Sequence, residues 1–225
     1  TCIRGATENN ILATMVARML SSSDPSQRMP LFVPVVLVGE ASRSGAAVSA
    51  GRKVTGAFED DPHGQLVFLE CAANCNGYHA AEARTVFVGG RRPEWLRATE
   101  VLINRALNAQ LAEMIPGTPA GRLFEVAQRI FGASTVPGGS VGCKGYSIGL
   151  GHGPTAQDCP LELTSFCEFE LQEGMVLYLT PWLQTPWGAV AMSLTAVVGR
   201  RRGRVLGRPL AGVAATDTDA LVPRR

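Results

Sequence analysis

One pattern of residues occurs twice in this chain, about 110 positions apart. Residues 3–20 contain a glycine turn, a capping residue and a stretch with apolar residues at helical spacing, and residues 115–131 repeat that order. Residues 85–89 (Thr-Val-Phe-Val-Gly) recur as residues 195–199 (Thr-Ala-Val-Val-Gly). The repeat predicts two copies of one helix-and-strand unit that face each other, with sheets inside, helices outside and a cleft between the halves.

Hydrophobic periodicity and turn residues predict the order of the elements. Helices are expected at 7–21 and at 93–114, and the second, which begins at Pro93, is the longest. Strands are expected at residues 31–38, 65–71, 77–88, 143–149, 165–171, 175–180, 188–198 and 204–206.

Length and composition are those of an ordinary folded domain. The chain has 225 residues, of which 46% are hydrophobic, and no linker divides it, so we expect one α+β domain with halves at 1–92 and 93–210 and a tail at 211–225. No apolar run approaches the roughly 18–20 residues of a membrane-spanning helix. Charged residues make up 18% and the net charge is +2. We therefore expect a soluble, cytoplasmic protein with no membrane or nucleic-acid partner, and a solvated turn at 200–204 in preference to a phosphate-binding patch.

Six cysteines raise the alternatives of a disulfide framework or a zinc site. Cys71, Cys75 and His79 are four residues apart, a spacing that gives a shared face on a helix but not across a strand and its turn. Reduced cysteines in a cytosolic protein are the favoured interpretation. Cys71 and Cys75 lie beside the expected cleft, so a reactive thiol at one of them remains an alternative.

The hairpin expected at residues 65–88 carries two short pairs of residues, Gly77-Tyr78 and Arg84-Thr85. Together with their neighbours these residues resemble the paired strands of the pita-bread family, peptidase family M24, which includes methionine aminopeptidase, aminopeptidase P, prolidase and creatinase. The resemblance covers nearly the whole chain. It implies the pita-bread fold, with two halves related by a pseudo-twofold axis, and it implies that the N-terminal part of the family fold is missing.

The same resemblance bears on metal binding. In the family, two Asp, one His and two Glu hold a pair of divalent metals. The resemblance extends through residues 145–150, 174–181 and 187–192, and the five ligand positions become Glu70, Ala81, Tyr146, Thr180 and Met192. One carboxylate does not supply the several carboxylates and the imidazole that two divalent ions need, so we expect no metal, and no other cofactor is indicated.

Strand alternation groups the candidate site residues. If Glu70 points into the cleft, His79 and Ala81 share its face on the partner strand. The candidate acid and base residues are Glu70, His79, Tyr146 and His152, which stands one residue short of the family's second, substrate-facing His. The candidate substrate contacts are Tyr78, Arg84, Tyr178, Thr180, Met192 and Ala81. The alternative is that these side chains fill the former metal space as an inert core.

Two functions of different class follow from this set. The first is a metal-independent enzyme, a lyase, cyclase or hydrolase, that acts on a small amino-acid-derived or peptide-like metabolite. The second is a non-catalytic pseudo-peptidase that binds a peptide or protein partner. The expected partners are a small-molecule or peptide-like ligand in the cleft and, as a further possibility, a second copy in a homodimer.

Overall fold

The computed structural model describes residues 5–21, 24, 26–28, 34–44, 51–54, 64–89, 92–132, 141–150, 161–207 and 215–216. The helices are α1 (Glu8–Leu20), α2 (Glu94–Glu113) and α3 (Gly121–Phe131), and a 3-10 helix covers Gly39–Ser44. The strands are β1 (Gln27–Arg28), β2 (Val35–Val38), β3 (Gln65–Cys75), β4 (Tyr78–Val88), β5 (Val141–Ser147), β6 (Val176–Thr185), β7 (Gly188–Ala191), β8 (Leu194–Val197), β9 (Arg204–Leu206) and β10 (Ala215–Thr216).

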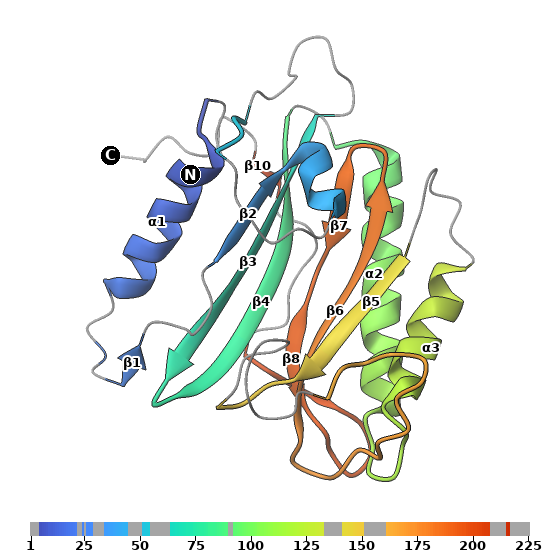
Figure 1. Cartoon of the computed structure of the whole chain (residues 1–225). Coiled ribbons are helices and arrows are strands. Elements are labelled where there is room, and N and C mark those ends of the chain that lie inside the picture. The colour runs from blue at the N-terminus through green and yellow to red at the C-terminus, as the bar shows by residue number, and fades with distance from the viewer. Residues whose placement is uncertain are drawn as a thin grey trace.

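The strands form two sheets that lie side by side (Figure 1). The first sheet has the order β1-β3-β4-β10, and β2 also pairs with β3. The second has the order β5-β6-β8-β9, and β7 also pairs with β6. All of these pairs are antiparallel except β4 with β10. The two sheets share one connection pattern, in which a helix precedes a strand that pairs with the first strand of a hairpin. In the first sheet these elements are α1, β2 and the β3–β4 hairpin, and in the second they are α3, β5 and the β6–β7 hairpin. This confirms the predicted α+β class.

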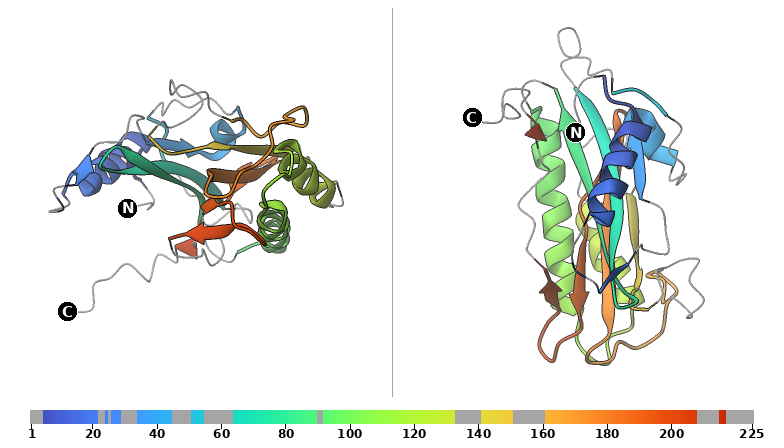
Figure 2. Two further views of the ribbon diagram at one scale, coloured as in Figure 1. Left: turned by 90° about the horizontal axis from the view of Figure 1, so that it is seen from below. Right: turned by 90° about the vertical axis from the view of Figure 1, so that its left-hand side faces the viewer.

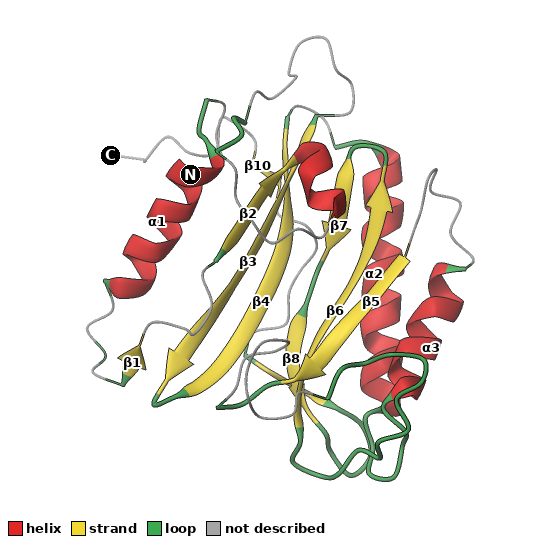
Figure 3. Cartoon of the chain, viewed as in Figure 1, coloured by secondary structure: helices red, strands yellow, loops and turns green. Residues whose placement is uncertain are grey.

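Helices cover the outer faces of the two sheets (Figures 2 and 3). Ile11 of α1 belongs to a buried cluster with Val36, Val67 and Val86 of the first sheet. A larger cluster joins the buried faces of α2 and α3 to the second sheet. Its members from β6 are Leu177, Leu179 and Leu183, which alternate with residues that point to the other side. The faces turned away from the helices are where the two sheets meet.

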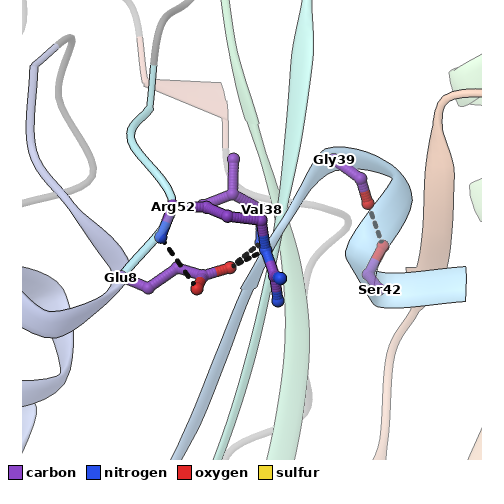
Figure 4. Close-up of polar contacts among 5 residues, drawn as sticks. All are labelled: Glu8, Val38, Gly39, Ser42 and Arg52. Atoms are coloured by element: carbon purple, nitrogen blue, oxygen red, sulfur yellow. Dashed lines mark hydrogen bonds and ion pairs between the residues drawn. The ribbon is translucent and has the colours of Figure 1, made fainter. Parts of the chain in front are cut away.

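Two local signals in the sequence explain how the first half begins. Thr7 caps α1 through a capping box, in which its side chain and that of Asn10 each accept a hydrogen bond from the other's backbone N–H. The next residue, Glu8, is fully buried, and Figure 4 shows its carboxylate between two backbone segments. It accepts bonds from Val38 N at 2.8 Å, Arg52 N at 3.1 Å and Arg52 Nε at 2.9 Å. Glu8 therefore joins α1 to the end of β2 and to residue 52.

The 3-10 helix after β2 connects the two sheets. Ser42 Oγ donates to Gly39 O at 2.6 Å (Figure 4) and accepts from Ala189 N of β7 at 2.7 Å. Gly188, at φ +140°, lies so close that a Cβ there would be 2.8 Å from Gly39 O. A side chain at position 188 would therefore push the two sheets apart.

Several elements differ from the sequence-based expectation. β6 extends to Thr185, five residues further than expected, and the strand expected at 188–198 is divided into β7 and β8. The segment 165–171 is not a strand; of its residues, Glu170 forms an isolated bridge to Pro119, which has no N–H to extend the pairing. β3 continues to Cys75, four residues further than expected. Ala215–Thr216, in the segment expected to be a tail, forms a parallel pair with β4.

Candidate functional site

The phenol of Tyr178 in β6 meets the carboxylate of Glu70 in β3. Tyr178 is fully buried and its hydroxyl donates to Glu70 Oε1 at 3.0 Å. Glu70 itself is partly exposed. The two residues are 108 positions apart, so the bond forms only because the inner faces of the two sheets meet.

Small apolar side chains surround this bond. The register of β3 and β4 sets Glu70 opposite Ala83 and Ala72 opposite Ala81, on one face of the hairpin. All three alanines are buried against Tyr178 together with Ile148, and Phe68 and Tyr146 pack at the edge. We call this set the Glu70 cluster; its members are Phe68, Glu70, Ala72, Ala81, Ala83, Tyr146, Ile148 and Tyr178.

The two phenols of the cluster pack against each other at a tilt and stay protonated. The ring centroids of Tyr146 and Tyr178 are 5.2 Å apart, with planes tilted by 56°. Burial raises the pKa of Tyr178 well above its ordinary value; Glu70 raises it further, and hydrogen bonding to Ser193 and Thr180 opposes part of the shift. Burial and Glu70 likewise raise the pKa of Tyr146. Both side chains are therefore hydrogen-bond donors at neutral pH rather than bases.

Ser193, rather than Met192, points toward the cluster. β6 pairs with β7 and β8 in one continuous register, which sets Thr180 opposite Ser193. Met192 is 1% exposed in the core that faces α2 and α3, so its expected place in the cleft is wrong by one residue. Ser193 Oγ accepts from Ala83 N at 2.5 Å. The sequence did contain a signal for Ser193: residues two apart in a strand face the same side, so Ser193 shares the face of Thr195.

Two further hydroxyl groups join β4 to the second sheet. Thr85 Oγ1 accepts from Ala191 N at 2.9 Å and donates to Ala189 O at 3.0 Å. Thr195 Oγ1 donates to Ala81 O at 3.1 Å. Both threonines are buried. Side-chain hydroxyls therefore satisfy backbone groups at the junction of the sheets and hold the Glu70 cluster in register.

His79 shares the inner face but lies away from Glu70. It pairs with Asn74, four residues along β3 from Glu70, which corresponds to roughly 13 Å at 3.3 Å per residue. Asn74 Nδ2 lies 3.1 Å from His79 Nε2, and Asn74 Oδ1 accepts from Gly77 N at 2.9 Å. His79 N and Nδ1 both lie against Gly149 O, at 2.7 and 3.3 Å. These bonds fit an imidazole with its proton on Nδ1 that fastens the hairpin to the loop after β5.

Tyr78 and Arg84 are on the opposite face of the hairpin, so the structure does not bring them to Glu70. Tyr78 is 62% exposed at the hairpin tip, and Arg84 Nε donates to Glu82 at 2.7 Å. In β4 the odd-numbered residues face Glu70, whereas Tyr78 and Arg84 are even-numbered and face the other side. His152 lies outside the residues that the structure describes.

The two cysteines near the hairpin have different surroundings. Cys71 is on the outer face, where burial raises the pKa of its thiol and the carboxylates of Glu82 and Glu70 raise it further. Cys75 is exposed and its sulfur lies 3.1 Å from Ser26 Oγ. Burial and the nearby carboxylates therefore favour the protonated thiol of Cys71 over the reactive thiolate.

A family model of metallopeptidase family M24 matches residues 1–200. The chain belongs to metallopeptidase family M24. The match covers the strands from β1 to β8 and the Glu70 cluster, and it confirms the resemblance seen in the hairpin at residues 65–88.

Similar proteins of known structure share the family fold. An X-Pro aminopeptidase from Thermotoga maritima is 17% identical with a TM-score of 0.77; the likeness covers 94% of this chain and 56% of that one. A dipeptidase from Pyrococcus horikoshii is 19% identical with a TM-score of 0.76; the likeness covers 95% of this chain and 56% of that one. The ectoine hydrolase of Halomonas elongata is 28% identical over 138 residues, 58% of this chain and 33% of that protein. The chain thus spans a third to about half of these relatives.

The Glu70 cluster does not fit the metal pair that the family name implies. Within the described ranges, no group of three or more His, Cys, Asp or Glu side chains is placed to hold a metal ion. Glu70 faces the methyl groups of Ala72, Ala81 and Ala83, and its Oε1 already accepts the bond from Tyr178. A hard divalent cation needs several oxygen or imidazole ligands, which this set does not offer.

Proposed function

We propose that this M24 chain is a metal-independent hydrolase that acts on a small amino-acid-derived or peptide-like metabolite at the Glu70 cluster. The observation that carries the proposal is the bond from Tyr178 to Glu70 within a frame of alanines. Besides the Glu70 carboxylate and the phenols of Tyr146 and Tyr178, the hydroxyls of Ser193 and Thr180 hydrogen-bond to Tyr178. The names of the relatives, a hydrolase and two peptidases, favour hydrolysis over the lyase and cyclase alternatives.

The polar groups of the cluster support one division of labour. The Glu70 carboxylate takes a proton from a water molecule as the water oxygen bonds to the carbon of a C–N group. The C–N bond then breaks, and the proton on Glu70 passes to the departing nitrogen. Tyr146, whose raised pKa keeps it protonated, donates a hydrogen bond to the negative charge that develops on the substrate. No step in this scheme uses a metal ion.

The experiment is hydrolysis of a defined panel by chelator-treated protein. The panel contains ectoine, X-Pro peptides and simple dipeptides, because the relatives are named for these substrates. We expect turnover of one panel member in the presence of EDTA and a fall of about 100-fold or more in Glu70→Gln, which keeps the size of the side chain and removes the base. Glu82→Gln, on the outer face of the same hairpin, is the matched control and should keep full activity.

Three results would contradict the proposal. Activity that appears only with added Mn²⁺ or Co²⁺ would mean that the cluster works with a metal. Binding of a panel member without turnover, unchanged in Glu70→Gln, would favour the non-catalytic pseudo-peptidase. Full activity of Glu70→Gln would remove Glu70 from the chemistry.

A further inference from the structure

Two phenylalanines are exposed on a firmly bonded segment next to the start of α3. Phe166 is 89% exposed and Phe169 is 50% exposed. Their segment is fixed to the start of α3, since Ala120 N donates to Phe169 O and Gly121 N donates to Cys167 O, both at 2.8 Å. Exposed aromatic side chains on a rigid segment are typical of a surface that binds a partner.

A pocket of about 510 Å³ opens beside this segment, between the end of α2 and the start of α3. Its charged lining is three carboxylates, Glu113, Glu125 and Glu168, against one guanidinium, Arg122. Arg122 is already engaged, with Glu113 at 3.3 Å and Glu125 at 3.4 Å. The pocket therefore has an excess of negative charge and is suited to a cationic side chain.

The same end of the molecule carries a basic turn between β8 and β9. The turn is fixed to α2, because Gly203 N donates to Leu111 O at 2.7 Å, two residues before Glu113. Arg201 and Arg202 on the turn, and Arg204 at the start of β9, are exposed and make no ion pair within the described part of the chain. Leu206, which follows in β9, is 38% exposed. An acidic pocket and a basic turn, each with exposed apolar residues, thus flank the end of one helix.

We propose that this end of the chain is a self-association surface, and that its partner is a second copy of the same chain. In a dimer with a twofold axis between the two patches, the Arg201–Arg202 turn of each copy contacts the acidic pocket of the other copy. The dimer therefore contains two identical turn-to-pocket contacts. Phe166 and Phe169 then face the Leu206 side of the partner copy. A second copy is favoured over an unrelated basic partner because both complementary patches are on one chain, at one end. The inference does not depend on the proposed hydrolase activity.

Sedimentation velocity across the micromolar range tests this dimer with paired charge reversals. The pocket variant is Glu125→Arg with Glu168→Arg, and the turn variant is Arg201→Glu with Arg202→Glu. In a dimer of either variant alone, both turn-to-pocket contacts bring like charges together, so the dimer dissociation constant should rise about tenfold or more. In an equimolar mixture of the two variants, a heterodimer has opposite charges at both turn-to-pocket contacts. Dimer formation should therefore be restored. Arg97→Glu, on an exposed position near the start of α2, is the control and should leave association unchanged.

Four outcomes would contradict the inference. A wild-type chain that stays monomeric throughout the range excludes the dimer. A dimer that is indifferent to both reversals uses another surface. Two monomeric variants, each with the circular dichroism and thermal transition of wild type, whose mixture remains monomeric would show that pocket and turn do not meet. Phe166→Ser, which alters no charge, should also weaken the wild-type dimer, and a dimer of unchanged strength contradicts the proposed contact.

Discussion

Tyr178 donates a 3.0 Å hydrogen bond to Glu70, and this bond joins the two sheets. The phenol comes from a fully buried position and the carboxylate from a partly exposed one. A hydrogen bond to a charged group contributes more to stability than a neutral one. The contact therefore matters for the fold as well as for the proposed chemistry.

Tyr178→Phe removes the hydroxyl and keeps the ring. We expect the free energy of unfolding to fall by about 1.5–3 kcal/mol, because Glu70 loses a donor in a partly buried place. Urea denaturation measures the change. Tyr78→Phe at the exposed hairpin tip is the control, and it should have little effect. Equal stability of the two variants would show that the Tyr178 bond contributes nothing.

Alkaline pH should weaken the fold through the same phenol. The pKa of Tyr178 in the folded state is raised above its ordinary value near 10, so the stabilisation is fully present below about pH 10 and is lost as the pH rises toward the folded-state pKa. Tyr146 contributes in the same direction. Unfolding free energies measured from about pH 8 to pH 11 should decline less steeply in Tyr178→Phe than in wild type. Parallel declines would contradict the assignment.

Thr85 provides a test of the junction between the sheets. Thr85→Val keeps the shape of the side chain but leaves Ala191 N and Ala189 O without the hydroxyl. We expect a loss of about 2–4 kcal/mol in unfolding free energy, since each buried polar group left unpaired costs about 1–3 kcal/mol. The matched control is Thr14→Val on the exposed face of α1, where the hydroxyl donates only to its own helix. A loss no larger than the control's would show that the junction does not depend on this hydroxyl.

Glu8 and Glu94 are both the first residues of helices but differ in burial. Glu8 is fully buried with Arg52 and Val38 N, whereas the side chain of Glu94 is 87% exposed. Glu8→Gln should lower the unfolding free energy by about 1.5–3 kcal/mol, because it removes the charge from hydrogen bonds to a guanidinium and two backbone N–H groups. Glu94→Gln should change it by a few tenths at most. Thermal denaturation of both variants distinguishes these results, and a similar change in both would contradict the role given to Glu8.

Local signals in the sequence were enough to predict most elements of the fold. Asn76 and Gly77 have φ values of 50° and 90°, as a tight hairpin turn requires, and that pair marks the end of β3 and the start of β4. The strand expected at residues 165–171 does not form. Strand formation also needs a pairing partner, and Pro119 limits what the neighbouring segment can pair with.

The candidate site could be predicted only as far as one hairpin reaches. The two-residue period of β3 and β4 correctly set His79 and Ala81 on the face of Glu70. It did not reveal that Tyr178 meets Glu70, because that contact depends on how two sheets dock. An error of one residue in the second sheet exchanged Met192 for Ser193, since neighbouring residues of a strand face opposite sides.

Metal retention tests the central claim most directly. Wild-type chain and Glu70→Ala are dialysed to equilibrium against Mn²⁺, Co²⁺ and Zn²⁺, and bound metal is measured by elemental analysis. We predict that wild type retains no stoichiometric ion and that the two proteins retain equal amounts, because alanines, phenols and one carboxylate do not make a hard-cation site. Stoichiometric metal in wild type that disappears in Glu70→Ala would contradict the account.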